Sequence, residues 1–229
     1  MATTQLPTPA IRNGFPLPAL LALATAVFVT ALTETLPAGV LPGMSGALGV
    51  GESAAGQAVT VYALGTAATA IPLTAATAGW GRKRLLLTAM AGFAAANTVT
   101  AASTNYPLTL AARFLAGVAA GLAWALLAGY ARRLVPVEQQ GRAMAVAMAG
   151  VPVALSLGVP VGTFLGQALA WWVPFLAMTA LALGVIGWIA ALLPDQPGQP
   201  AGGGGPRARP PPPAPGGRGA RPAARLVVA

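Results

Sequence analysis

The sequence predicts an all-α polytopic membrane protein, because of its composition and the way its charges are spaced. Of the 229 residues, 56% are hydrophobic and only 7% are charged, whereas a soluble domain carries about 25% charged residues. Residues 85–112 and 143–194, runs of 28 and 52 residues, contain no charge at all. A helix crosses a bilayer with about 20 mostly apolar residues, so both runs are long enough to span it.

Six transmembrane helices are expected, over residues 17–41, 56–79, 85–103, 108–130, 143–166 and 171–193. The first helix follows Arg12 and ends where Pro42, Gly43 and Gly46 interrupt the apolar run. The basic turn that starts at Gly81 separates the second helix from the third.

The later helices are separated by equally plain signals. Residues 103–107, Ser-Thr-Asn-Tyr-Pro, break the third helix from the fourth, and residues 132–142 hold three arginines and a proline before the fifth. The last uncharged run is ~78 Å long as a helix, which is enough for two crossings and a short turn. Trp171 and Trp172 fall where aromatic anchors at the membrane surface are expected.

The basic residues predict the orientation. With the N-terminus inside, 12 of the 13 Lys and Arg residues fall in cytoplasmic segments and none in an outer loop, as the positive-inside rule requires. We therefore expect a multi-pass protein of the plasma (cytoplasmic) membrane with both termini cytoplasmic: a cytoplasmic segment 1–14, a bundle 15–194 and a tail 195–229. Cleavage of residues 1–36 as a signal peptide is disfavoured, because the apolar run is too long and contains Glu34.

Two charges are predicted to lie inside helices. Glu34 is ~12 Å and Arg113 ~9 Å from the outer end of the first and fourth helices, so they are at similar depth. A lone charge there costs ~2.5–3.5 kcal/mol, which pairing within the protein would offset. Chemistry alone leaves two interpretations open: a static ion pair between the helices, or a carboxylate that changes protonation as its access to water alternates.

Small residues recur at every fourth position in two helices. In the fifth helix they are Gly150, Ala154, Gly158, Gly162 and Gly166, and the fourth helix repeats the pattern from Gly117 to Gly129. Such stripes allow helix backbones to approach closely in lipid, so we interpret both as packing surfaces. Pro152 and Pro160 predict a bend in the fifth helix.

Enzymatic and metal-binding functions find little support. The chain has no His and no Cys, which removes the usual transition-metal ligands and the usual general base. The acidic residues Glu52, Glu138 and Asp195 are not spaced as catalytic carboxylates. The four glycines at 202–205 lack the strand and the Lys-Ser/Thr of a phosphate loop. We expect no enzyme activity, no cofactor and no metal site.

Four segments together resemble the major facilitator superfamily, and within it the twelve-helix drug:proton antiporter branch with its sugar- and arabinose-efflux-like members. They are residues 34–42, ETLPAGVLP, the turn 81–86, GRKRLL, residues 110–117, LAARFLAG, and residues 158–163, GVPVGT. The resemblance covers residues 15–195. One departure is Ala78, where the family's loop usually has an acidic residue that latches the inner ends of the helices.

The resemblance implies half of a major facilitator fold: six helices arranged as two inverted three-helix repeats. Helices 1 and 4 would correspond, which would make Glu34 and Arg113 a proton-coupling pair facing the central cavity. The remaining implied roles are conformational motifs at Gly81, Arg82, Lys83, Gly158, Pro160 and Gly162, and cavity positions at Gln57, Tyr62 and Trp124, each of which could equally serve packing.

The expected function is therefore proton-coupled efflux of a drug or sugar-type small molecule, with the lipid bilayer, protons, the substrate and a second six-helix half as partners. The alternative is a non-transporting six-helix fragment or assembly partner. Residues 194–229 hold 10 Pro and 8 Gly, which predicts a disordered tail; its abrupt composition suggests a frameshift or a gene-boundary error in the coding sequence. Nucleic-acid binding by its five arginines is disfavoured.

Overall fold

The computed structural model describes residues 15–77 and 79–195. The predictions for segment 1–14 and for almost all of the tail therefore lie outside the described residues. The described residues are helical throughout, with helices α1 Leu17–Gly39, α2 Leu41–Leu48, α3 Glu52–Ala70, α4 Pro72–Ala76, α5 Arg82–Ala102, α6 Tyr106–Arg133, η1 Val137–Gln139, α7 Gln140–Met148, α8 Gly150–Val153, η2 Ala154–Gly158, α9 Val159–Ala168 and α10 Val173–Leu192.

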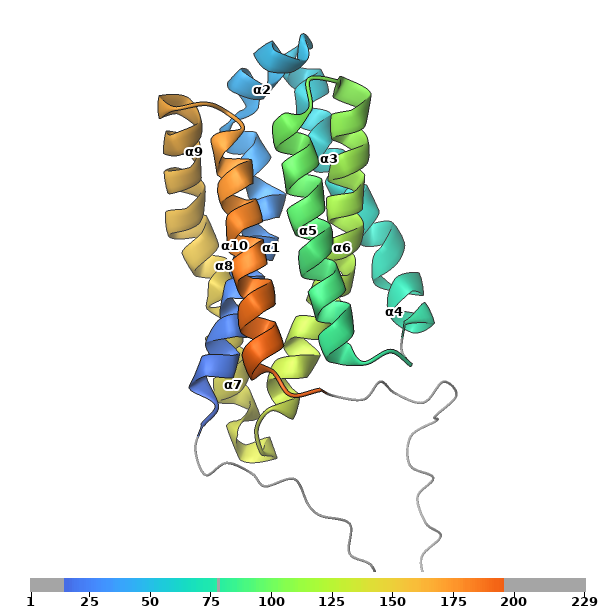
Figure 1. Cartoon of the computed structure of the whole chain (residues 1–229), viewed down its shortest axis with the longest axis vertical. Coiled ribbons are helices and arrows are strands. Elements are labelled where there is room, and N and C mark those ends of the chain that lie inside the picture. Colours follow the sequence, from blue (N-terminus) through green and yellow to red (C-terminus); the bar gives the residue numbers. More distant parts are fainter. Residues whose placement is uncertain (1–14, 78, 196–229) are drawn as a thin grey trace, which may run out of the picture.

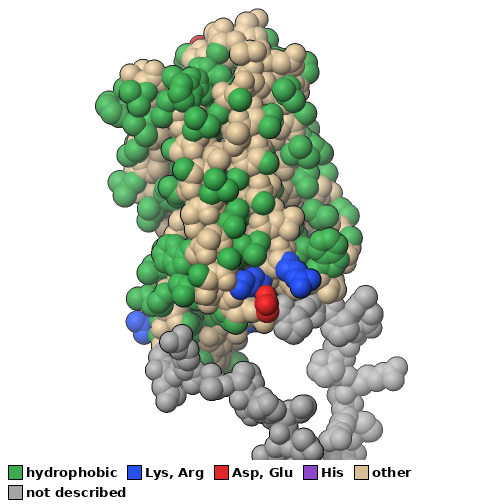
Figure 2. All heavy atoms as spheres, in the orientation of Figure 1, with side chains coloured by type: hydrophobic (Ala, Val, Ile, Leu, Met, Phe, Trp, Pro, Cys, Tyr) green, Lys and Arg blue, Asp and Glu red, His purple; other side chains and the backbone are tan. Residues whose placement is uncertain are grey.

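The long helices run side by side as one bundle (Figure 1). α6 packs between α3 and α5, and α5 packs against α10. α1 lies on the inside of the bundle, where it contacts α3, α6, α10 and the α7–α9 segment. It is correspondingly the most buried of the spanning helices, and the apolar core gathers around it. Charged side chains collect at the end of the bundle that holds the start of α5 and the end of α10 (Figure 2).

Five helices among the described residues are long and apolar enough to cross a membrane. They match the first, third, fourth, fifth and sixth predicted helices. The second predicted helix, 56–79, is α3 followed by α4: it begins four residues earlier, at Glu52, and is interrupted at Ile71 before Pro72. α3 is rich in Gly, Ala and Thr and falls short of the hydropathy of the other five.

One predicted detail was wrong. Pro42, Gly43 and Gly46 do not end helical structure; they lie in α2, which starts after a kink at Val40 and ends at Gly49 in the left-handed conformation (φ 64°). Proline fits there because it occupies the first turn, where its missing N–H costs nothing. The fifth helix, in which a bend was expected, widens into the π-helix η2.

The π-helix has a local cause. Pro160 has no N–H to donate to the carbonyl of Ser156, and its ring would clash with that carbonyl in a regular helix. The chain instead makes a wider turn, in which the Val159 N–H bonds to the Ala154 carbonyl five residues back. The predicted bend is therefore present as a π-bulge.

Candidate functional site

Arg113 lies at the centre of the bundle and is completely buried. Its Nη2 donates a hydrogen bond to the backbone carbonyl of Thr33 on α1 at 2.7 Å. Its guanidinium also stacks over the ring of Tyr62 on α3, 4.8 Å from the ring centroid. Its Nε and Nη1 are buried and have no hydrogen-bond partner within residues 15–77 and 79–195. The cation is thus held by one carbonyl and one aromatic face.

The Thr33 carbonyl is free to accept this bond because of Pro37. In a regular helix, this carbonyl would accept the N–H of the residue four positions later, and that residue is Pro37, which has none. The proline sits inside α1 and the helix continues around it. The sequence therefore creates an unpaired acceptor one residue before Glu34, and Arg113 pairs with it.

Glu34 itself is half-buried on α1. We predicted that its carboxylate pairs with Arg113, but the guanidinium bonds to the carbonyl of the preceding residue, and its other two nitrogens have no partner among the described residues. Because Glu34 directly follows Thr33, it lies on the turn of α1 that Arg113 contacts. The two charges are therefore neighbours across α1 and α6 without a direct hydrogen bond.

A polar network that sequence reasoning missed extends from the same point. Asn97 on α5 is fully buried and donates from Nδ2 to the Thr33 hydroxyl at 3.3 Å. That hydroxyl in turn lies 3.5 Å from the sulfur of Met178 on α10. Thr33 thus connects α1 to α5, α6 and α10. The available signal was Asn97 itself, a strongly polar side chain in the middle of an uncharged run.

Tyr62 can reach the cation because α3 and α6 pack with their backbones in contact. A Cβ placed on Gly117 would overlap the carbonyl of Tyr62, and one on Gly121 would lie 2.9 Å from the carbonyl of Thr66. Thr66 also donates a hydrogen bond to the Gly117 carbonyl at 3.1 Å. The glycine stripe predicted on the fourth helix is thus a packing surface, and it places Tyr62 against Arg113.

The stripe on the fifth helix packs in the same way, against α1. A Cβ on Gly150 would overlap the carbonyl of Ala24, and one on Gly162 would overlap the side chain of Leu36. Gly158 faces the ring of Phe28. This contact continues past the π-bulge, so the bent helix remains close to α1 along its length.

The other predicted site residues are dispersed. Gln57 is exposed on α3, Tyr62 is buried in the Arg113 site and Trp124 is half-buried on α6. Gly81 precedes the first residue of α5. Lys83 reaches across the charged end of the bundle and donates to the Ala190 carbonyl, in the last turn of α10, at 2.9 Å. A cation is favourable there because the end of a helix carries partial negative charge.

This architecture is that of a polytopic helical membrane protein: long apolar helices, close packing through small residues and a buried cation among them. Residues 23–227 match the family described as the Major Facilitator Superfamily. The chain belongs to this superfamily, and its relatives include efflux pumps.

Two relatives illustrate the similarity. The chain is 37% identical over 195 residues to a chloramphenicol resistance protein of Streptomyces lividans, covering 85% of this chain and 49% of the relative. It is 31% identical over 183 residues to the purine ribonucleoside efflux pump NepI of Escherichia coli O6:K15:H31, covering 80% and 46%. The chain thus spans about half the length of the curated relatives it matches.

A solved structure shares the fold. The human organic anion transporter MFSD10 (TETRAN) matches with a TM-score of 0.53 at 22% identity, over 82% of this chain and 49% of that one. The six-helix unit predicted from the sequence is confirmed as half of a major facilitator fold.

Proposed function

We propose that this chain forms the N-terminal half of a proton-coupled efflux transporter for small molecules. The observation that carries the proposal is the placement of Arg113: it is a fully buried cation, held by a carbonyl of α1 rather than neutralised by a bonded carboxylate. Such a charge inside a membrane is costly and usually functional. The similarity to chloramphenicol and purine ribonucleoside pumps supports a small organic substrate.

In this mechanism Glu34 carries the coupling proton. The ionised carboxylate attracts the nearby guanidinium, and protonation removes that attraction. Because Arg113 already bonds to the residue before Glu34, the change acts directly on the contact between α1 and α6. Proton uptake from the outside and release to the cytoplasm would then favour alternate arrangements of the two helices.

The conformational motifs complete the proposal. Gly158, Pro160 and Gly162 let the segment η2–α9 bend while it stays packed on α1. Gly81 and Lys83 form the turn at the charged end, where the Lys83 bond to α10 is positioned to break and re-form as the ends move.

The exposed face of α3 supports a path for substrate between this unit and a second six-helix half. Besides Leu64, it carries the small or polar residues Gln57, Thr60, Ala63 and Ala67, whereas α10 exposes several large apolar side chains such as Leu183. Small and polar surfaces suit contact with protein or water rather than with lipid. We place Gln57 on this face as a substrate-cavity residue and Trp124 on the neighbouring α6.

Orientation is part of the proposal. The charged end of the bundle, which holds the turn before α5 and the last turn of α6, is placed on the cytoplasmic side by the positive-inside rule. Both termini are then cytoplasmic, and the membrane is the cytoplasmic membrane. The chain is assigned transport and no enzymatic reaction.

The test is flux in liposomes. The purified chain, alone and together with a six-helix C-terminal half from a relative, is reconstituted with an imposed pH gradient and labelled chloramphenicol or a purine ribonucleoside. We expect gradient-driven flux that Glu34→Gln abolishes and Glu52→Gln, at an exposed position, leaves unchanged. Flux that persists in Glu34→Gln contradicts the proposed coupling.

The same experiment distinguishes transport from the second candidate function, that of a non-transporting six-helix assembly partner. The observation that favours this candidate is that the chain spans about half of its relatives. Flux only in the presence of the second half supports a partner that works in a pair. The absence of flux in both preparations supports a chain without transport activity.

A further inference from the structure

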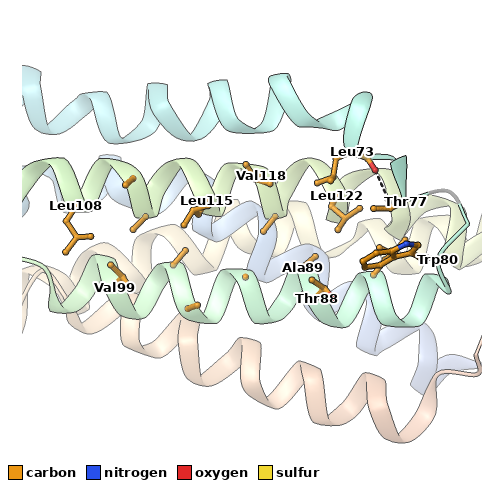
Figure 3. A pocket seen from close by; sticks show the side chains of 17 residues that line it. Leu73, Thr77, Trp80, Thr88, Ala89, Val99, Leu108, Leu115, Val118 and Leu122 are labelled. Carbon is orange, nitrogen blue, oxygen red and sulfur yellow. Dashed lines mark hydrogen bonds between the residues drawn. The ribbon is translucent and has the colours of Figure 1, made fainter. Parts of the chain in front are cut away.

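An apolar groove runs along the outer surface of the bundle between α5 and α6 (Figure 3). It has a volume of about 510 Å³. Leu108, Leu115 and Leu122 of α6 form one wall, Val99 and Ala89 of α5 form part of the other, and Trp80 lies at one end. Leu108, Leu115 and Trp80 are each more than half exposed, so this groove opens outward and is separate from the buried Arg113 site.

The groove follows α6 through the membrane. The three leucines are seven residues apart, so they lie on one face of α6 and span ~21 Å along its axis. One leaflet of hydrocarbon is ~15 Å deep, so the groove extends beyond a single leaflet. In the proposed orientation Leu108 lies near the outer end of α6, and the part of the groove between Leu115 and Trp80 lies toward the cytoplasmic side. None of the lining residues is charged.

Two arginines, Arg82 and Arg133, lie beyond the Trp80 end of the groove. Gly129 continues the leucine stripe seven residues after Leu122, and the Arg82 guanidinium reaches this position: its Nη1 is 3.8 Å from a Cβ built on Gly129. Arg133 lies 18 residues, or five turns, after Leu115 and so faces the same way. Arg82 and Arg133 therefore lie at the same end of this face of α6.

Among the described residues, no carboxylate forms an ion pair with Arg82 or Arg133. The Arg82 Nε is buried and has no hydrogen-bond partner in this part of the chain. Two like charges with an unpaired buried donor form a site for an anion, and this site stands at the end of an apolar channel.

We propose that the groove binds an anionic diacyl phospholipid, with one acyl chain between α5 and α6 and the phosphate between Arg82 and Arg133. Trp80 lies at the level of the headgroup, where the indole ring is favoured. In the proposed orientation this is the cytoplasmic leaflet, whose anionic lipids attract basic segments. By bridging Arg82 and Arg133, the phosphate holds the start of α5 against the end of α6.

Native mass spectrometry of the full chain, released from detergent with equal amounts of dioleoyl phosphatidylglycerol and phosphatidylcholine, tests the headgroup. We expect preferential retention of phosphatidylglycerol, and a fall of about 30-fold in that preference in the double variant Arg82→Gln/Arg133→Gln. The matched double variant Arg132→Gln/Arg142→Gln removes the same charge at the same end and should keep the preference. An equal fall in both variants, or no preference in the unmodified chain, overturns the proposal.

Two experiments test whether an acyl chain occupies the groove: a substitution that fills the groove, and competition by other ligands. Leu115→Trp should reduce retention of phosphatidylglycerol, while Leu183→Trp, on the exposed face of α10, should not. Displacement of the lipid by inorganic phosphate alone would reassign the site to a simple anion. Displacement by oleate alone would reassign it to a single-chain anionic amphiphile. Either result contradicts a diacyl phospholipid.

A third measurement does not depend on whether the arginine variants fold, because it uses none of them. Trp80 is 59% exposed, and the difference in fluorescence between the unmodified chain and Trp80→Phe isolates its emission. Phosphatidylglycerol with brominated acyl chains should quench this emission more strongly than brominated phosphatidylcholine does. Equal quenching by the two lipids would mean that the groove contacts bulk lipid without selecting a headgroup.

Discussion

Replacing Arg113 by methionine distinguishes a coupling cation from a structural one. Methionine is unbranched and fills a similar space with little strain. The variant removes a charge that costs ~2.5–3.5 kcal/mol inside the membrane. It also removes the charged hydrogen bond to Thr33, worth about 1.5–3 kcal/mol, and the stacking on Tyr62, worth up to ~2 kcal/mol when desolvated. These contributions cancel to within about 2 kcal/mol.

We therefore expect Arg113→Met to leave the free energy of unfolding within about 2 kcal/mol of the unmodified chain and to abolish gradient-driven flux. A static ion pair with Glu34 predicts something different, because breaking a buried pair costs about 3–5 kcal/mol. Unfolding by sodium dodecyl sulfate in lipid–detergent bicelles, followed by tryptophan fluorescence, measures the difference.

Glu34→Gln and the double variant complete a thermodynamic cycle. The absence of a direct hydrogen bond between the two side chains predicts a small coupling energy for unfolding, below about 1 kcal/mol, as for weakly interacting charges. A loss of about 3 kcal/mol or more in Arg113→Met, together with a coupling energy of the same size, would refute the reasoning.

Three further predictions follow from the same contacts. Pro37→Ala supplies the N–H that α1 lacks, so it should compete for the carbonyl that binds the buried guanidinium and reduce flux while the fold persists, as judged by circular dichroism. Gly117→Val should cost about 1–3 kcal/mol of unfolding free energy by overpacking α3 against α6, whereas Gly187→Val, with open space around it, should cost less than 1 kcal/mol in the same measurement. Because the chain has no Cys, single cysteines report topology: an impermeant maleimide should label Glu52→Cys in intact cells but Glu138→Cys only after permeabilisation, and the opposite pattern contradicts the orientation.

Most of the fold could be predicted because charges, prolines and apolar runs decide where the chain can cross a membrane. Asn105, expected in the break before the fourth helix, is its N-cap and accepts from the Leu108 N–H at 3.0 Å. The errors arose where one residue has two possible effects. Pro42 interrupts an established helix but also begins one well, and only the kink at Val40 decides which occurs.

The site was harder to predict than the fold. Glu34 and Arg113 could be identified because any charge in an apolar helix is conspicuous. Their arrangement could not be predicted, because opposite charges are expected to pair with each other. A backbone carbonyl such as that of Thr33 is not marked as an acceptor by its own residue type. That acceptor does have a signal, namely a proline four residues later. Asn97 gave a weaker signal, because its hydrogen bond to Thr33 depends on how α5 and α1 are packed.

The position of Tyr62 connects the buried cation to the outside of the bundle. The inner side of α3 presents Tyr62 to Arg113, while its outer side carries Gln57 and Thr60. The glycine contact holds the backbones of α3 and α6 together. A molecule or a second half that presses on the outer face of α3 therefore acts on a packed pair of helices that includes Arg113. In the proposed mechanism, a substrate bound at α3 and a proton bound at Glu34 would both act on this cation, and neither would need to contact the other.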